Sequence, residues 1–172
     1  MIYFDALTES DCEQIRKWRN RDIAGARTPF LLTEEMQRDF YFDELSNRDS
    51  KHRYWAIRRD ISVDLTTERA ILLGIAGLTN IEWENGRAEI ALMIAPDERG
   101  KGYGREAFEL IKLWGFARMR LHTIYACVYG NNPALVAWWQ FACKPSEIVS
   151  YPDGKQWDGK YHRTYHMTWV NE

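Results

Sequence analysis

The segment P-D-E-R-G-K-G-Y-G-R covers residues 96–105 and holds three glycines at every second position. An apolar run at 90–95 precedes it, and a run of helix-forming residues at 106–111 follows it. This pattern predicts a strand that ends at the glycines and a helix that begins there. Because glycine adopts positive φ without strain and leaves the backbone accessible, we expect a turn that exposes its main chain.

The start of a helix is a natural site for an anion. The first backbone N–H groups have no partner within the helix, and the helix dipole adds partial positive charge. Lys101 and Arg105 would add further positive charge. The sequence lacks the G-x-x-x-x-G-K-[ST] pattern of a P-loop and the G-x-G-x-x-G pattern of a dinucleotide site. The segment therefore predicts a pyrophosphate site of another type, and a glycine turn without a ligand is the alternative.

Apolar periodicity and turn signals predict a single α/β domain over residues 1–172. The element order is β-αα-βββ-α-β-α-ββ, which gives a mixed sheet of about seven strands with about four helices. Residues 60–69 are expected to join the second and third strands, and Asn85-Gly86 marks a hairpin turn before the fourth. The strands are predicted at 2–7, 54–57, 71–78, 88–95, 123–129, 147–151 and 161–170, and helices are predicted to begin near 8, 33, 103 and 132.

The composition limits the classes of function. The 172 residues carry a formal net charge of −2, which argues against nucleic-acid binding through phosphate contacts. Three widely separated cysteines and four histidines without metal-site spacing predict no metal site and indicate a reducing compartment. The sequence has no long apolar segment and no basic leader. We therefore expect a cytoplasmic chain with no membrane partner.

The glycine segment resembles a known family motif. Residues 99–104 are similar to the acetyl-CoA motif [Q/R]-x-x-G-x-[G/A] of the GNAT N-acetyltransferase superfamily, and residues 94–98 resemble the strand end and short loop before that motif. Asn131, Asn132 and Ala134 resemble a second block of the family, N-x-x-A. The resemblance covers nearly the whole chain and implies the GNAT fold, acetyl-CoA as co-substrate and transfer of an acetyl group to a primary amine.

The resemblance also implies a set of cofactor contacts. The main-chain amides of the glycine segment would hold the pyrophosphate, and the backbone of the preceding strand would pair with the pantetheine amides. An asparagine at the start of the next helix would touch the cofactor arm. The expected cofactor-binding residues are Met93, Ile94, Arg99, Gly100, Lys101, Gly102, Tyr103, Gly104, Arg105 and Asn131.

The chemistry requires a base, because an ammonium group has no free lone pair for attack on a thioester. Glu89 is the first candidate, directly or through water, at a place where many family members carry an acidic residue. Glu84 and Glu82 are alternatives beside the predicted hairpin, and an exposed or structural role for Glu89 also remains open. A backbone N–H near Met93 or Ile94 would stabilise the oxyanion.

The thiolate leaving group needs a general acid, and the family often has a tyrosine for it where this chain has Trp138. Indole does not donate a proton at a useful pKa. Tyr129 is therefore the candidate acid, with Tyr125 nearby, and protonation of the thiolate by water is the alternative. The absence of the usual tyrosine also leaves open that the chain is not an enzyme but a non-catalytic module that binds CoA or a partner.

Segments 18–20, 33–35 and 151–158 resemble one branch of the superfamily, which includes ribosomal-protein N-terminal acetyltransferases and enzymes that acetylate nucleotide-linked amino sugars. This predicts a protein N-terminal amine as acceptor, with a small-molecule amine as the alternative. A polyamine acetylase would be expected to carry more acidic excess. Arg27, in the loop expected to line the acceptor, is either a ligand for a carboxylate or phosphate or a surface residue. The strand-rich C-terminus leaves a homodimer open.

Overall fold

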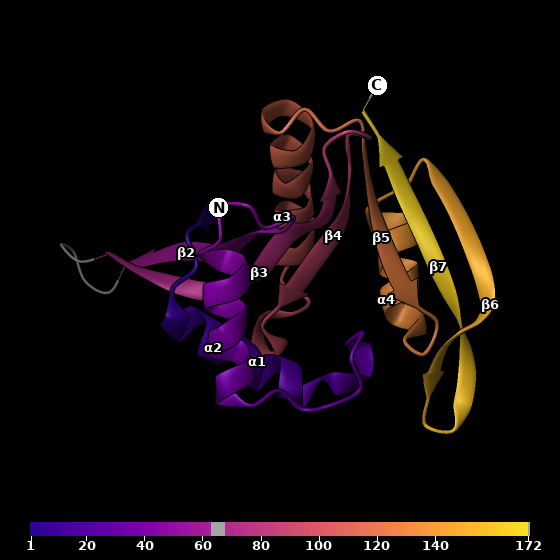
Figure 1. Cartoon of the computed structure of the whole chain (residues 1–172), viewed down its shortest axis with the longest axis horizontal. Helices are drawn as coiled ribbons and strands as arrows, with labels where there is room; N and C mark the ends of the chain where they lie inside the picture. The colour runs from indigo at the N-terminus through magenta and orange to yellow at the C-terminus, as the bar shows by residue number, and fades with distance from the viewer. Residues whose placement is uncertain (63–67, 172) are drawn as a thin grey trace.

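The computed structural model describes residues 1–62 and 68–171 and contains one seven-stranded mixed sheet in the order β1-β2-β3-β4-β5-β7-β6 (Figure 1). Only β4 and β5 pair in parallel, and the other neighbours are antiparallel. The strands are β1 (Tyr3–Asp5), β2 (Arg53–Ser62), β3 (Glu68–Glu82), β4 (Arg87–Ile94), β5 (Thr123–Tyr129), β6 (Glu147–Trp157) and β7 (Lys160–Val170). The predicted element order and the α/β fold are confirmed.

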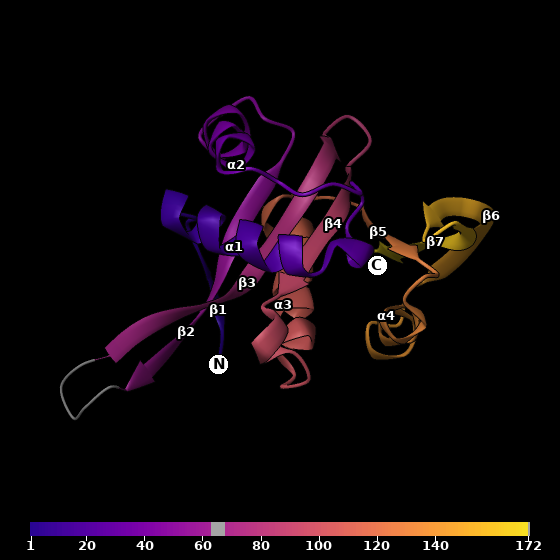
Figure 2. The same cartoon turned by 90° about the horizontal axis from the view of Figure 1, so that it is seen from below.

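Four α-helices accompany the sheet in the described residues: α1 (Glu9–Arg21), α2 (Glu34–Phe40), α3 (Tyr103–Lys112) and α4 (Pro133–Ala137). Each of the last three continues into a π-helical stretch, at Tyr41–Leu45, Leu113–Arg118 and Trp138–Ala142. Figure 2 shows the sheet from below with these helices around it. Within the part of the chain that the structure describes, no helix is long and apolar enough to cross a membrane.

The two faces of the sheet carry separate apolar clusters. Ile15 and Trp18 of α1 pack with Met93 of β4 on one face. Phe108 of α3 lies in the larger cluster, against which Ile94 packs on the opposite face. Because side chains alternate along a strand, the odd-numbered residues of β4 face α1 and the even-numbered residues face α3.

The second and third strands are longer than predicted. They run through Ser62 and from Glu68, so they occupy half of the segment expected to be a connection. Residues 63–67 of that predicted connection lie outside the described residues. Apolar periodicity did not predict this extension, because many of its residues are charged. The antiparallel backbone pairing nevertheless continues to Ser62↔Glu68, since it does not depend on side-chain polarity.

The sheet opens between its two halves. β4 and β5 pair only over Arg87–Glu89, in register with Thr123–Tyr125. Beyond this point β4 stays paired with β3 as far as Ile94, and β5 stays paired with β7 as far as Tyr129. Each half therefore keeps one neighbour while the facing edges separate, and Figure 1 shows the two strands diverging.

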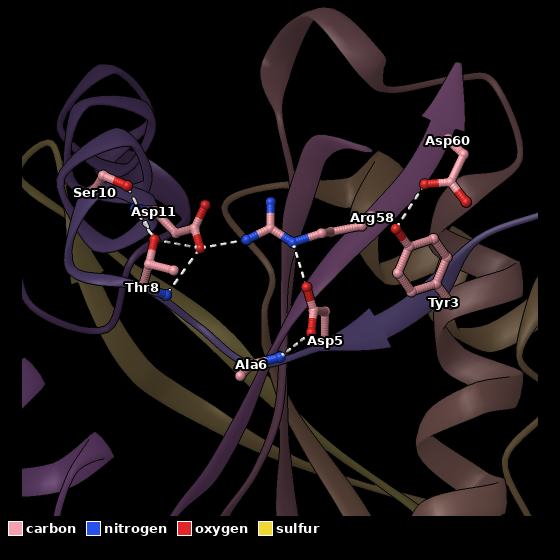
Figure 3. A network of polar contacts seen from close by, with 8 residues as sticks. All are labelled: Tyr3, Asp5, Ala6, Thr8, Ser10, Asp11, Arg58 and Asp60. Atoms are coloured by element: carbon pink, nitrogen blue, oxygen red, sulfur yellow. Dashed lines mark hydrogen bonds and ion pairs between the residues drawn. The ribbon is translucent and has the colours of Figure 1, made fainter. Parts of the chain in front are cut away.

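A polar network joins the first strand, the first helix and the second strand (Figure 3). Thr8 caps α1 in a capping box, and Asp11 Oδ2 accepts from the Thr8 backbone N–H at 2.9 Å. Arg58 on β2 donates to Asp11 Oδ2 at 2.6 Å and to Asp5 Oδ2 at 2.9 Å. Tyr3 donates to Asp60 at 2.7 Å, and this hydrogen bond raises the pKa of the tyrosine. The network fixes α1 on the sheet.

Candidate active site

The glycine segment forms the turn between β4 and α3. Gly102 is the N-cap of α3 with φ of 89°, and Gly100 has φ of 78°. A Cβ built on either residue would meet no atom within 4 Å. Packing therefore does not require glycine at these two positions. The left-handed backbone favours it, and the space above the turn is open.

The backbone amides of this turn are free to bind a ligand. Within residues 1–62 and 68–171, the N–H groups of residues 100–104 make no hydrogen bond, and the first paired amides are those of Arg105 and Glu106, which donate to Gly102. Five successive donors at the start of a helix make a strong anion site. The structure thus places the predicted pyrophosphate residues together, at the wide end of the opening between β4 and β5.

The charged side chains of the turn are partly engaged already. Arg99 Nη1 lies 2.7 Å from Asp22 Oδ2, and Lys101 Nζ lies 3.0 Å from Glu98 Oε2. Arg105 is exposed, and no carboxylate among the described residues forms an ion pair with it. The Asp22 contact ties the end of α1 to the glycine turn.

Trp138 lies beside the same turn. A Cβ on Gly104 would meet the Trp138 ring at 3.2 Å and Ile94 at 3.8 Å. The ring also packs edge-on against the buried Trp139, with centroids 4.9 Å apart. At the place of the usual tyrosine, the chain therefore has an apolar ring that lines the opening next to the glycine turn.

Asn131 leaves one buried polar atom without a partner. Its Nδ2 donates to the backbone oxygen of Ala24 at 2.8 Å, while its Oδ1 is buried and accepts nothing from the described residues. An unsatisfied buried acceptor is unusual, and it fits a donor from a ligand amide. Met93 and Ile94 lie across the opening on the part of β4 that no longer pairs with β5.

Glu89 occupies the point where β4 and β5 part. It is 7 % exposed and lies in register with Tyr125. Its Oε2 accepts from Asn80 Nδ2 at 2.9 Å, and its Oε1 forms an ion pair with Arg27. Burial acts to lower the pKa of Arg27, but a hydrogen bond with Tyr129 and the charge of Glu89 outweigh it and raise that pKa.

The other predicted catalytic residues differ in position. Tyr129 ends β5 beside Arg27, on the same face of the sheet as Glu89. Glu84 is exposed in the turn between β3 and β4, and no contact links it to Glu89 within the described part of the chain. The structure thus brings Glu89 and Tyr129 together and leaves Glu84 apart.

Sequence reasoning missed Lys155 and Asn80. Lys155, on β6, is 8 % exposed, and its Nζ donates to the backbone oxygens of Ala26 at 2.9 Å and Arg27 at 3.3 Å. The ammonium lies 4.8 Å from the centre of the Tyr129 ring, and burial lowers its pKa. No local pattern marks either residue: Lys155 contacts a segment 129 residues away in the sequence, and Asn80 binds Glu89 across the β3–β4 hairpin.

A family model for the acetyltransferase (GNAT) domain matches residues 2–138. The chain belongs to the GNAT acetyltransferase family. The predicted superfamily is confirmed, and the glycine turn lies where that family's cofactor motif was expected. Within the described residues, no group of three or more His, Cys, Asp or Glu side chains is placed to hold a metal ion.

Curated relatives include spermidine N(1)-acetyltransferases. The enzyme of Vibrio cholerae serotype O1 is 32 % identical over 95 residues, which cover 55 % of this chain and 54 % of that protein. The Escherichia coli enzyme is 32 % identical over 91 residues, covering 53 % and 47 %. The chain therefore matches about half the length of these relatives. Their names support the superfamily but not the predicted branch of ribosomal-protein N-terminal acetyltransferases.

Solved structures extend the likeness to the whole fold. The Vibrio cholerae spermidine N-acetyltransferase in complex with CoA and spermine has a TM-score of 0.79 at 22 % identity, over 98 % of this chain and 95 % of that one. A dodecameric form of the same enzyme has a TM-score of 0.74 at 22 % identity, over 98 % and 93 %. At this identity the comparison supports the fold alone.

Proposed function

We propose that the chain transfers an acetyl group from acetyl-CoA to the primary amine of a small cationic molecule, with spermidine as the first candidate. The observation that carries this proposal is the row of five free amides at residues 100–104, which faces the opening whose far end holds Glu89. An anion site and a buried carboxylate at the two ends of one opening suit a phosphorylated donor and an amine acceptor.

The proposed cofactor contacts follow the opening. The amides of residues 100–104 bind the pyrophosphate, and Arg105 contributes charge at the surface. The separated edge of β4 at Met93 and Ile94 pairs with the pantetheine amides. Asn131 Oδ1 accepts from one of these amides, which would satisfy its buried oxygen. Trp138 covers the arm beside Gly104.

The proposed chemistry begins with loss of a proton from the acceptor ammonium. Glu89 binds that ammonium and takes the proton directly or through a water molecule, a role that contributes about 100- to 10,000-fold in such reactions. The free amine then attacks the thioester carbon, and a backbone N–H near Met93 or Ile94 stabilises the oxyanion. Tyr129 or water protonates the departing thiolate, because Trp138 has no suitable proton.

The choice of acceptor rests on the relatives and on the charge at Glu89. The names of the relatives favour a polyamine, whereas the net charge of −2 gives little overall attraction for one. The buried carboxylate of Glu89 supplies negative charge at the point of reaction instead. A protein N-terminal amine and an amino-sugar amine are the second candidates, since each arrives as a single ammonium group.

An acetyl-transfer assay tests the proposal. The native chain and acetyl-CoA are combined with spermidine, an N-terminal peptide and an amino sugar, and CoA release and the acetylated product are measured. We expect the highest kcat/KM with spermidine. Preference for the peptide or the sugar would correct the acceptor. Binding of acetyl-CoA without transfer to any amine would favour the non-catalytic module.

A further inference from the structure

The acceptor end of the opening already contains a cation that belongs to the chain. Arg27 follows a short 3₁₀ turn at Ile23–Gly25 and forms an ion pair with Glu89, 62 residues away in the sequence. In Figure 1, the indigo segment after α1 reaches below the diverging strands β4 and β5. The guanidinium thus lies where an acceptor ammonium would have to meet the carboxylate.

Glu89 needs a cation on its open side. Its side chain is 9 % exposed, and Asn80 supplies one neutral hydrogen bond to Oε2. Within the described residues, the only ion pair of Glu89 is with Arg27. A buried carboxylate without a positive partner is costly. Removal of Arg27 from this place therefore requires another cation to take it.

The Arg27 side chain can leave without disturbing the backbone around it. Its side chain is 59 % exposed, so the guanidinium reaches water by rotation about its own bonds. The backbone is fixed independently, since Lys155 binds the oxygens of Ala26 and Arg27, and Asn131 binds that of Ala24. These contacts hold the segment in place while the side chain moves.

We propose that Arg27 occupies the cation subsite of the acceptor cleft and that the acceptor ammonium displaces it from Glu89. The exchange replaces one cation by another, so the buried carboxylate stays neutralised throughout. An amine that arrives uncharged, or one that carries an anion beside the reacting nitrogen, gains nothing at Glu89 and does not displace the arginine. Arg27 is therefore a specificity residue that selects cationic acceptors. This inference rests on the proposed acetyl-transfer function.

Steady-state kinetics with spermidine test the exchange. Arg27→Ala removes the competing cation, and we expect KM for spermidine to fall about three- to tenfold, as apparent affinity rises when a competing state is removed. Arg27→Lys keeps a competing cation that pairs less well with Glu89, so its KM should lie between those of the native chain and Arg27→Ala. Arg38→Ala is the matched control, because Arg38 is also 59 % exposed and paired, with Glu9 at the surface, and its KM should not change.

A higher KM in Arg27→Ala would overturn the proposal and identify Arg27 as a ligand for the acceptor. An unchanged KM would overturn it as well. If the native chain acetylates no amine, the proposed function is wrong. The displacement of Arg27 is then tested separately, by calorimetric titration of ethylguanidinium. Arg27→Ala should bind this cation, and the double variant with Glu89→Gln should not. Failure of Arg27→Ala to bind ethylguanidinium would overturn the exchange.

Discussion

Asp11 and Glu89 are both 7 % exposed, and each forms an ion pair with an arginine from a distant segment. Arg58, the partner of Asp11, is 13 % exposed and also binds Asp5, so two carboxylates hold it (Figure 3). Arg27, the partner of Glu89, is 59 % exposed and binds one carboxylate.

The difference lies in the arginine rather than in the carboxylate. Arg58 is enclosed, and Asp11 is further bound by the cap of α1, so this pair joins elements of the fold. Arg27 caps a buried charge from the solvent side, so its place is open to another cation. In the proposed exchange, a buried carboxylate acts as structure or as a binding site according to whether its partner can leave.

The largest expected effect is on acetyl transfer, and it distinguishes Glu89 from Asp11. Glu89→Gln removes the proposed base and ammonium ligand, and we expect kcat/KM for spermidine to fall by about 100-fold or more. Asp11→Asn should keep kcat within about twofold in the folded fraction, because Asp11 touches no proposed substrate. An equal loss of kcat in the two variants, measured by CoA release, would remove the distinction.

The second effect is on stability, and it compares the buried ion pair of Arg58 with the exposed ion pair of Arg38. Arg58→Ala leaves Asp11 buried without its cation, and we expect the free energy of unfolding to fall by about 3 kcal/mol. Arg38→Ala breaks an exposed pair and should cost less than about 0.5 kcal/mol. Denaturant unfolding followed by circular dichroism measures both. A similar small loss for the two variants would contradict the structural role of Arg58.

The third effect is on thiol reactivity, and it compares Cys127, near Glu89, with Cys12, next to Asp11. Burial, and then the charge of Glu89, raises the pKa of Cys127, which is half-buried. Burial raises the pKa of Cys12 to about 11, and Cys12 is 1 % exposed next to Asp11. Only thiolate reacts, so iodoacetamide labelling should speed up with pH through the alkaline range.

We expect Cys127 to be labelled at least about tenfold faster than Cys12 in the folded chain, because the Asp11 region opens only with local unfolding. Glu89→Gln should speed the labelling of Cys127, since loss of the nearby negative charge lowers the thiol pKa. Mass spectrometry of peptides reads both rates. Faster labelling of Cys12 would show that the Asp11 region is the more open one.

The smallest effect concerns the backbone behind Arg27. Lys155→Met keeps the length of the side chain but removes its hydrogen bonds to Ala26 and Arg27. The segment loses its tether, so we expect KM for spermidine to change by about two- to fivefold with kcat retained. Loss of kcat in parallel with KM would give Lys155 a direct part in the reaction.

The turn at the proposed cofactor end of the site could be predicted from the sequence, because it is formed by consecutive residues. Three alternating glycines between a strand and a helix specify a turn whose amides point outward, and the structure has that turn at Gly100 and Gly102. The order of elements followed from periodicity and turn signals for the same reason.

The acceptor end could not be predicted in the same way, because its contacts depend on tertiary packing. Glu89 was singled out, but its pairing with Arg27 spans 62 residues, and Lys155 reaches back 129 residues to Ala26. Asn80 takes its place at an irregularity between β3 and β4 that no local pattern marks. Local sequence therefore offered the carboxylate as a candidate and left its neighbours unknown.

The most direct test of the proposed function is calorimetric titration of acetyl-CoA into the native chain, Gly102→Val and Gly159→Val. Gly159 is the matched control, because it too has positive φ, at 71°, and open space around it, but in the β6–β7 turn. Each valine should cost about 1–2 kcal/mol of stability through the strained backbone. We predict that Gly102→Val loses at least about 100-fold in affinity for acetyl-CoA, while Gly159→Val binds as the native chain does. Equal binding by all three chains, or none by the native chain, would contradict a pyrophosphate site at the glycine turn.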